Sequence, residues 1–435
     1  MKLHILEKFD YLLVFCVSIL IIFGIFCIYS SGVNFQGEVV SSEYIKQITF
    51  GVSGFIIMII VTFLDFRRVK RFALYLYIAY LIILGYTFFF GRYVNGARSW
   101  LGIGNFGVQP SEFGKIIFIL FLAMFLERSE KYRPFKRFLI SFGILCLPAG
   151  LVLLQPDMGT ASVYIPIFLA MVFVAGVAVK YIIYLIGTGI ITILFTIIPI
   201  WQEKIFQKSL PIVTIFVNSK IRIILLTALL VVTIIGALGY YIYKNKYYYW
   251  ITYIFSMITL SYFLSFLAGK VLQDYQIMRL IVFINPQIDP LGSGWNIIQS
   301  KIAIGSGSFL GQGYLLGTQS HYRFLPQQST DFIFGILAEE FGFVGGLTVF
   351  ILYFLIMIRI LFIMKNTKNT FGYYIAAGIL AMFFFHFVVN IGMVMGIMPI
   401  TGIPLLFLSY GGSSLWTAMI AIGLLMSISS RQFEH

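Results

Sequence analysis

Apolar runs and short polar connections alternate along almost the whole chain. A helix needs about 20 apolar residues to cross a hydrocarbon core of about 30 Å. Runs of this kind lie near residues 11–31, 45–64, 71–90, 112–127, 137–154, 160–178, 181–200, 222–243, 249–272, 332–363, 372–397 and 403–429. The pattern predicts an all-α, polytopic integral membrane protein with about twelve transmembrane helices.

Composition supports a membrane protein. Of the 435 residues, 60% are hydrophobic and only 11% are charged, which is far from the balance of a soluble globular domain. Cys16, Cys27 and Cys146 all lie in apolar runs without a CxxC pair, so neither a disulfide framework nor a zinc site is indicated. The sequence has no P-loop, which argues against a self-powered pump.

The basic residues indicate how the chain is oriented. Lys and Arg accumulate in short loops on the cytoplasmic side, and an N-terminus in the cytoplasm puts most of them there, including Arg67, Arg68, Lys70 and Arg71. Both termini are then cytoplasmic, and three longer segments, 91–111, 201–221 and 273–331, are extracytoplasmic. Topology and anionic membrane lipids account for the net charge of +14, so nucleic acid is not an expected partner.

The sequence predicts a single membrane domain over residues 1–435, because no linker rich in Pro, Ser or charge divides the chain. Its largest polar stretch is the extracytoplasmic loop 273–331. A loop of about 58 residues is uncommon unless it is functional or disordered. The aromatic and aliphatic residues of this loop argue against disorder.

Asp331 lies where this loop meets the next apolar run. Ser329 or Thr330 can cap the following helix and leave Asp331 in its first turn, where a carboxylate that only complements the helix dipole contributes about 0.3–1 kcal/mol. Glu339 and Glu340 lie about 12–13 Å further along a helix that rises 1.5 Å per residue. The dipole explains at most one of three acids on a membrane helix, which favours a wet cavity.

Other polar groups in the apolar runs have both structural and functional interpretations. Glu112 and Lys115 share one helix face, either as a self-satisfied ion pair or with the cation aimed at phosphate. Trp100 on its own is most simply an interfacial anchor, and Asp157 is most simply an N-cap in a turn that contains Pro and Gly. The stretch 409–414, with Ser413, interrupts the last run and either lines a cavity or is a plain kink.

Five stretches combine polar, glycine and proline residues at the ends of the apolar runs: NGARSWLGIGNFGVQPSEFGK (95–115), LLQPDMGT (153–160), DPLGSGWNIIQSKIAIGSGSFLGQG (289–313), LGTQSHYRFLPQQSTDFIFGILAEEFG (316–342) and MPITGIPLLFLSYGGSS (398–414). Together they resemble the SEDS family of bacterial cell-wall proteins, and its elongation members more than its division members. Family members have ten spans, so the two surplus spans predicted here form an inserted helical pair within 201–272. An even number of extra crossings leaves the sidedness of later segments unchanged.

The resemblance implies a peptidoglycan glycosyltransferase that polymerises lipid II on the outer face of the bacterial cytoplasmic (inner) membrane. It also implies a class B penicillin-binding protein as the transpeptidase partner. Asp331 matches the family's essential Asp, Trp100 its functionally important Trp, and Glu112 with Lys115 the polar pair of its central cavity. Ser413 is a further candidate for substrate binding.

The implied reaction assigns chemistry to these residues. An α-linked donor that yields a β-1,4 glycan requires inversion, for which one carboxylate acts as general base, and we expect Asp331 in this role. The departing pyrophosphate needs positive charge, and the candidates are Arg98, Lys115, Lys301 and Arg323. A divalent cation, Mg²⁺ or Mn²⁺, would suit the same task, although no metal motif is visible. No soluble cofactor is expected, because the activated donor supplies the driving force.

Two other functions are compatible with a polar cavity in the membrane. A lipid II flippase would also need intramembrane charges, but it would not need a single base at the outer rim. A noncatalytic scaffold would only recruit or activate a penicillin-binding protein. The two alternatives predict different consequences of replacing Asp331.

Overall fold

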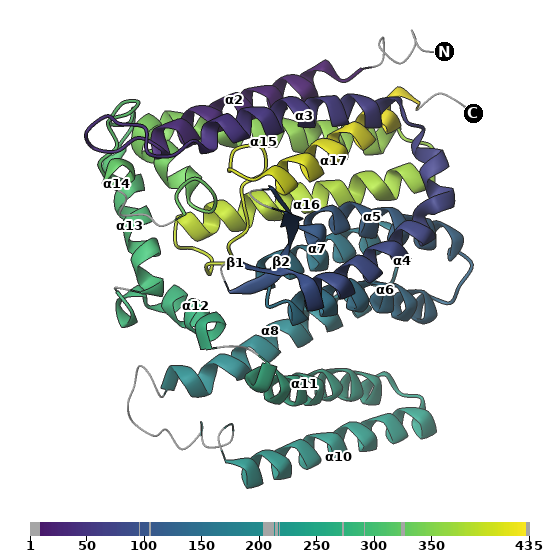
Figure 1. Cartoon of the computed structure of the whole chain (residues 1–435). Coiled ribbons are helices and arrows are strands. Elements are labelled where there is room, and N and C mark those ends of the chain that lie inside the picture. The colour runs from purple at the N-terminus through teal and green to yellow at the C-terminus, as the bar shows by residue number, and fades with distance from the viewer. Residues whose placement is uncertain are drawn as a thin grey trace. The chain divides into compact units, whose positions relative to one another are not determined.

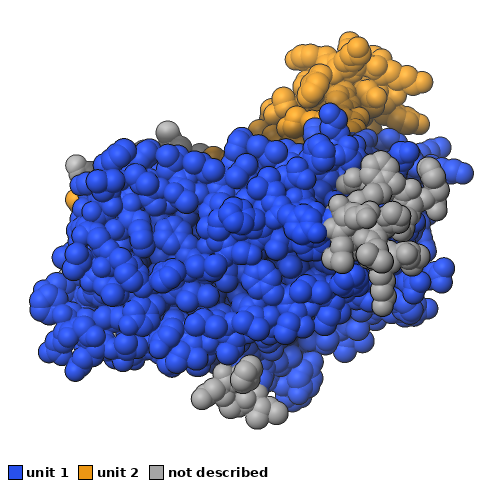
Figure 2. Space-filling model, turned by 90° about the horizontal axis from the view of Figure 1, so that it is seen from above, with its two compact units in different colours: residues 1–177, 296–435 blue, residues 178–295 orange. Residues whose placement is uncertain are grey.

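The computed structural model describes residues 9–94, 96–103, 106–202, 213, 216, 218–271, 274–290, 292–322 and 327–431. The chain forms two compact units, residues 1–177 with 296–435 and residues 178–295, which Figure 2 distinguishes by colour. All candidate site residues within the described ranges belong to the first unit.

Helices make up nearly all of both units (Figure 1), which confirms the all-α prediction. The first unit contains α2 (Tyr11–Ser31), α3 (Glu43–Phe63), α4 (Phe66–Phe90), α5 (Pro110–Arg128), α6 (Pro134–Leu154), α7 (Met158–Val174), most of α13 (Ser293–Ser306), α14 (Thr318–His321), α15 (Ile333–Asn366), α16 (Thr370–Val394) and α17 (Gly412–Ser430). The second unit contains α8 (Val179–Trp201), α10 (Ser219–Tyr243), α11 (Lys246–Val271), α12 (Asp274–Ile284) and the 3₁₀-helix η2 (Pro286–Ile288).

Each predicted apolar run contains a helix. Among the described residues, 10 helices are long and apolar enough to cross a membrane: α2, α3, α4, α6, α8, α10, α11, α15, α16 and α17. The other two predicted runs form α5, which carries four charged side chains over 19 residues, and α7, which has 17 residues. The predicted start of the last run was wrong, because α17 begins at Gly412 and residues 399–411 form no helix.

Helix starts follow from capping side chains. Asp10 Oδ1 accepts a hydrogen bond from the Leu13 amide at 3.1 Å, and Asp65 Oδ1 accepts one from the Arg67 amide at 3.0 Å. Asp157 Oδ1 accepts one from the Thr160 amide at 3.0 Å, which caps α7. Each carboxylate thereby satisfies an amide that has no partner within its own helix. Asp157 therefore has the structural role that its turn sequence indicates.

The core of the first unit is formed around α16 and α17. Of their most apolar windows, 67% and 78% of the residues are buried, whereas the corresponding share is 28% for α3 and for α4. α16 packs against α5, α7 and α15, and α17 packs against α3 and α5. A polar side chain on α16 or α17 therefore needs a partner inside the protein.

Two glycines permit close approaches in this core. A Cβ atom on Gly24 would lie 2.5 Å from the carbonyl oxygen of Leu408, and one on Gly423 would lie 2.7 Å from the carbonyl oxygen of Met58. The first contact seats the nonhelical segment 405–408 against α2. The second brings α17 against α3. Both contacts position the chain that surrounds Ser409 and Ser413.

A small antiparallel sheet precedes α5 and was not predicted. Its strands are β1 (Arg92–Val94), β2 (Ala97–Ile103) and β3 (Phe106–Val108), in the order β1-β2-β3. Trp100 lies opposite Arg92 in the β1–β2 pairing, and its ring lies close to Gly107, where a Cβ atom would be 3.0 Å from the ring. The strands are short, so the surrounding fold rather than a long alternating pattern defines them.

The segment that leads to Asp331 is packed against a break in α15. At Gly342 the backbone has φ 63° and ψ −157°, which interrupts the helix. The carbonyl oxygens of Glu339 and Glu340 accept hydrogen bonds from the amides of Gln312 at 2.9 Å and Gly313 at 3.1 Å. The long loop is thus an ordered structure in its described parts, as its composition indicates.

The second unit contains the predicted helical pair. In Figure 1, α10 and α11 are adjacent helices joined by a short connection, and α11 also packs against α8. Lys244 ends α10 in a left-handed conformation with φ 50°, which reverses the chain direction. The interpretation of this pair as an insertion relative to the family remains a prediction.

Candidate active site

Asp331 is partly buried and lies just before α15, not in its first turn. The N-cap residue of α15 is Phe332, and no acidic side chain occupies the first turn. The predicted capping by Ser329 or Thr330 was therefore wrong. Because the charge–dipole effect falls off within the first turn, the helix dipole is a weak reason for a carboxylate at this position.

Three separate elements hold the segment that ends in Asp331. Gln328 Nε2 donates to the Ser31 carbonyl oxygen at the end of α2, at 2.8 Å. The Tyr410 amide donates to the Ser329 carbonyl oxygen at 2.8 Å. Asn390 Nδ2 of α16 donates to the Asp331 carbonyl oxygen at 2.9 Å. These contacts hold the Gln328 side chain and the backbone carbonyl groups of Ser329 and Asp331.

Asn390 also connects this segment to the nonhelical chain before α17. Its Nδ2 atom donates a second hydrogen bond to the Ile403 carbonyl oxygen at 2.7 Å, and the side chain is completely buried. One amide group thus ties two irregular segments to a rigid helix. Asn390 was not predicted from the sequence, although an Asn within an apolar run, four residues after His386, is a signal that both side chains share a helix face.

The sequence-predicted pair Glu112 and Lys115 forms a buried ion pair on α5. Lys115 Nζ lies 2.7 Å from Glu112 Oε1, and both side chains are almost completely buried. Lys115 Nζ also lies 3.2 Å from His386 Nε2 of α16. On the other side of the imidazole ring, His386 Nδ1 lies 2.9 Å from the Pro404 carbonyl oxygen.

These partners determine the protonation of His386. A carbonyl oxygen only accepts hydrogen bonds and a lysine ammonium only donates them. The ring proton therefore belongs on Nδ1, facing Pro404, and the lone pair of Nε2 accepts from Lys115. In this arrangement His386 is neutral, and Lys115 is shared between Glu112 and His386 rather than presented as a free cation.

The two polar groups lie on one face of α16. His386 and Asn390 are one turn apart, about 6 Å along the helix axis at 1.5 Å per residue. His386 contacts residue 404 and Asn390 contacts residue 403, so both hold the same irregular segment. The Lys115 cluster and the Asp331 backbone are thus coupled through α16.

The start of α5 is tied to α17 and α7. The Gln109 amide donates to Ser413 Oγ at 3.1 Å, and Gln109 Nε2 donates to Asp157 Oδ2 at 2.6 Å. Ser413 is buried, and in the described part of the chain its hydroxyl oxygen orders the helix start. The stretch 409–414 is therefore a structural junction between elements as well as a break in the last apolar run.

The remaining candidates lie around this junction. Arg98 is exposed on β2 and Trp100 is partly buried on the same strand, in the sheet that leads into α5. Lys301 is exposed on α13 and lies against the end of α16, where a Cβ atom on Gly396 would be 2.2 Å from Lys301 Cε. Arg323 lies outside the described residues.

Tyr410, which lies before the last membrane helix, is a residue near the site whose surroundings alter its ionisation. Burial, and secondarily the nearby Glu43 carboxylate, raises the pKa of the Tyr410 hydroxyl above its ordinary value. The hydroxyl thus remains a protonated donor at neutral pH. Within the described ranges, no group of three His, Cys, Asp or Glu side chains is arranged to hold a metal ion.

Taken together, the helices and the site define a polytopic membrane protein with an acidic residue, held through its backbone, just before a long helix. The chain belongs to the FtsW/RodA/SpoVE family, described as cell cycle proteins, whose model matches residues 10–218 and 202–434. This confirms the resemblance to the SEDS family.

Similar proteins cover nearly the whole chain. The peptidoglycan glycosyltransferase RodA of Treponema pallidum (strain Nichols) is 52% identical over 432 residues, which cover 99% of this chain and 100% of that protein. The peptidoglycan glycosyltransferase MrdB of Escherichia coli (strain K12) is 34% identical over 379 residues, covering 87% of this chain and 83% of its own length.

Two solved structures share the fold. A chain of a peptidoglycan synthase complex that coordinates polymerization and crosslinking has a TM-score of 0.65 and 25% identity, covering 98% of this chain and 99% of its own. A mutant of the rod shape determining protein RodA from Thermus thermophilus has a TM-score of 0.61 and 22% identity, with the same coverage of 98% and 99%. The second likeness concerns the fold alone.

Proposed function

We propose that this protein is a peptidoglycan glycosyltransferase that polymerises lipid II into β-1,4 glycan strands during cell elongation. The observation that carries the activity is the 52% identity with the peptidoglycan glycosyltransferase RodA over the full length of that protein. The observation that carries the site is Asp331, which is partly exposed and held through its backbone by α16. The proposed location is the cytoplasmic membrane, with both termini inside and Asp331 outside.

The reaction forms one bond and breaks another at the same carbon. The acceptor sugar's 4-hydroxyl oxygen bonds to the anomeric carbon of the donor as the bond from that carbon to the pyrophosphate oxygen breaks. The polyprenyl pyrophosphate leaves with the bonding electrons, and the hydroxyl proton passes to the Asp331 carboxylate. Inversion requires the base and the leaving group on opposite faces of the sugar.

Asp331 contributes as a general base whose position is fixed in advance. A sugar hydroxyl is too weak an acid to ionise beforehand, so its proton moves as the new bond forms, a contribution of about 10² to 10⁴ in rate. Asn390 and the Tyr410 amide fix the chain on either side of the base. Such positioning lowers the entropic cost of bringing the base to the acceptor.

The cations divide into two groups. Arg98 and Lys301 are exposed and suit the pyrophosphate, as Arg323 does by sequence. Lys115 is buried between Glu112 and His386, which supports a role in joining α5 to α16 rather than direct contact with phosphate. A divalent cation remains a proposal for sharing the charge, with exposed carboxylates and the substrate's own phosphates as its ligands.

A class B penicillin-binding protein is the proposed partner. The solved relative at a TM-score of 0.65 belongs to a peptidoglycan synthase complex that coordinates polymerization with crosslinking. Such a partner would crosslink the glycan as it leaves the site. Both the donor and the acceptor of the proposed reaction are linked to lipid, which explains why the proposed catalytic group lies in a bundle of membrane helices.

The test uses purified full-length protein in vesicles that carry labelled lipid II on the accessible side. We expect polymer that a muramidase cleaves to disaccharide units. Movement of lipid II between leaflets without polymer would overturn the proposal in favour of a flippase. Polymer that forms only when a catalytically active partner glycosyltransferase is added would favour a scaffold.

A further inference from the structure

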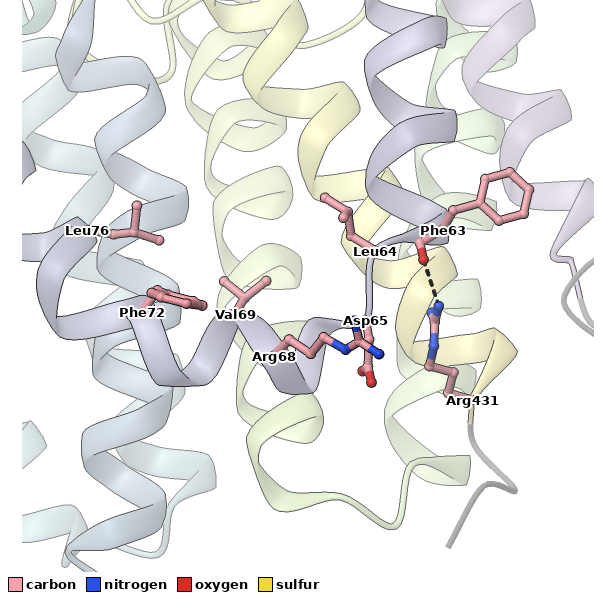
Figure 3. Close-up of a pocket in the computed structure, with 8 residues that line it drawn as sticks. All are labelled: Phe63, Leu64, Asp65, Arg68, Val69, Phe72, Leu76 and Arg431. Atoms are coloured by element: carbon pink, nitrogen blue, oxygen red, sulfur yellow. Dashed lines mark hydrogen bonds between the residues drawn. The ribbon is translucent and has the colours of Figure 1, made fainter. Parts of the chain in front are cut away.

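A groove lies at the end of the first unit opposite to Asp331, where α3 passes into α4. It is lined by Phe63, Leu64, Asp65, Arg68, Val69, Phe72, Leu76 and Arg431 (Figure 3). Phe63 and Leu64 end α3, Asp65 caps α4, and Arg431 follows α17. The proposed reaction does not use these residues.

One face of α4 forms the long wall of the groove. Residues 65, 68, 69, 72 and 76 recur at the spacing of a single helix face. Arg68 and Leu76 are eight helix rises apart, about 12 Å along the axis. Because the basic residues of α4 end at Arg71 and its apolar run begins there, the groove starts at the membrane boundary and reaches the apolar part of the span at Phe72 and Leu76.

The polar and apolar lining residues are separated along this depth. Asp65, Arg68 and Arg431 lie at the mouth, whereas Phe72 and Leu76 lie deeper along α4 (Figure 3). Phe72 is 60% exposed and Leu64 is 54% exposed, so the groove is open to an apolar medium. An occupant must therefore have a polar end at the boundary and an apolar end below it.

The charges at the mouth favour an anionic polar end. Arg67, Arg68, Lys70 and Arg71 occupy the first turns of α4. Lys70 is paired with Glu127, with Nζ 2.5 Å from Oε2, and an Arg67 nitrogen donates to the Arg431 carbonyl oxygen at 3.3 Å. Among the described residues, no hydrogen bond or ion pair engages the exposed guanidinium of Arg68.

Arg431 shapes the mouth and is itself fully engaged. Its guanidinium donates to the carbonyl oxygens of Thr62 at 3.2 Å and Phe63 at 3.0 Å, and to Ser427 Oγ at 2.7 Å. The same residue thereby caps the end of α3 and the end of α17. One carboxylate oxygen of Asp65, Oδ1, is engaged as the cap of α4, because it accepts a hydrogen bond from the Arg67 amide. Arg68 is therefore the lining cation that can bind the anionic end of an occupant.

From these observations we propose that the groove binds an anionic phospholipid of the adjacent leaflet. The phosphodiester would lie at Arg68, and one acyl chain would run along Val69, Phe72 and Leu76. A soluble peptide or metabolite would not need a wall whose inner residues, Phe72 and Leu76, belong to a membrane span. A zwitterionic lipid would place its own cation beside Arg68. With the topology proposed above, the leaflet is the cytoplasmic one.

Binding is measured on the full-length protein by native mass spectrometry, with phosphatidylglycerol or phosphatidylcholine added to the detergent-solubilised protein. We expect Arg68→Gln to weaken retention of one phosphatidylglycerol about fivefold, the worth of one basic residue beside anionic lipid. The matched control, Arg128→Gln, removes an exposed arginine from the end of α5 and should leave that retention unchanged. Equal loss in both variants, or no loss in either, would overturn the proposal.

The apolar wall is tested independently with a phosphatidylglycerol that carries a photoreactive acyl chain. Crosslinks should fall on residues 69–76 and decrease severalfold in Phe72→Ala. They should persist in Tyr75→Ala, which removes an aromatic ring of similar depth and 69% exposure that does not line the groove. Soluble glycerol phosphate should not compete at millimolar concentration. Competition by it, or equal crosslinking by phosphatidylcholine, would show that the groove does not select an anionic lipid.

Discussion

The buried ion pair between Glu112 and Lys115 allows a structural role to be separated from a catalytic one. Lys115→Met keeps the length and apolar stem of the side chain but leaves Glu112 as a buried carboxylate without its cation. His386 Nε2 loses its donor in the same variant. Breaking one partner of a buried pair costs about 3–5 kcal/mol, because the remaining charge stays desolvated.

The structure predicts that a second substitution removes most of this cost. In the double variant Glu112→Gln and Lys115→Met, no charge remains at the site, and replacing both partners of a buried pair is often close to neutral. We expect Lys115→Met to lower Tm by about 5 °C, since the shift per kcal/mol decreases with chain length. The double variant should recover most of that loss.

The assay combines thermal unfolding in detergent with the polymerisation rate per folded molecule. The control is Lys70→Met, which breaks the more exposed Lys70–Glu127 pair and should cost at most about 1 kcal/mol. If Lys115 only joins α5 to α16, the double variant polymerises lipid II at a rate close to wild type. A double variant that is stable but inactive would refute this reasoning and return Lys115 to the pyrophosphate.

Three further predictions concern the support of Asp331. Asn390→Leu leaves the Asp331 and Ile403 carbonyl oxygens without their donor, at a cost of about 1–3 kcal/mol each. The variant should lower kcat more than it raises KM, and an unchanged kcat would exclude the positioning role. Gly342→Ala puts a Cβ atom 2.2 Å from the Gly311 amide nitrogen, at a residue with φ 63°. Amide hydrogen exchange should therefore increase across residues 307–313, and unchanged exchange would contradict the break in α15 at Gly342. Glu339→Ala removes the acceptor of the Gln319 amide at 2.8 Å and the Ser320 amide at 3.2 Å, so proteolysis near α14 should accelerate, whereas wild-type resistance would show that the carboxylate is dispensable there.

The membrane helices could be predicted from the sequence because their length follows from the bilayer thickness and their composition from its polarity. The last run shows the limit of that reasoning. Ile403, Leu405 and Leu408 are completely or almost completely buried in a segment without helix. The sequence of this segment is therefore apolar, as the sequence of a membrane-spanning helix is. Apolarity reports burial, and it does not distinguish a helix from irregular chain that the protein covers.

The charged residues of the candidate site could be named from the sequence, whereas the residues that hold the site's backbone could not. Asp331, Glu112 and Lys115 are conspicuous because charge inside an apolar run is costly. Asn390 donates hydrogen bonds to the backbone carbonyl groups of residues 331 and 403. Such contacts with the backbone cannot be predicted from the spacing of side chains. The cap of α15 was wrong because the Tyr410 amide engages the Ser329 carbonyl, a contact across 81 positions of the chain that local rules do not contain.

The most direct measurement of the central claim is the polymerisation rate of Asp331→Asn with saturating labelled lipid II. Glu130→Gln, which neutralises an exposed acid in the connection after α5, is the matched control. If Asp331 is the general base, kcat should fall by a factor of about 10² to 10⁴ in Asp331→Asn. Thermal stability and partner binding should be retained in this variant, and the control should have wild-type activity. Polymer formed by Asp331→Asn at the wild-type rate would contradict the assignment of this carboxylate as the general base.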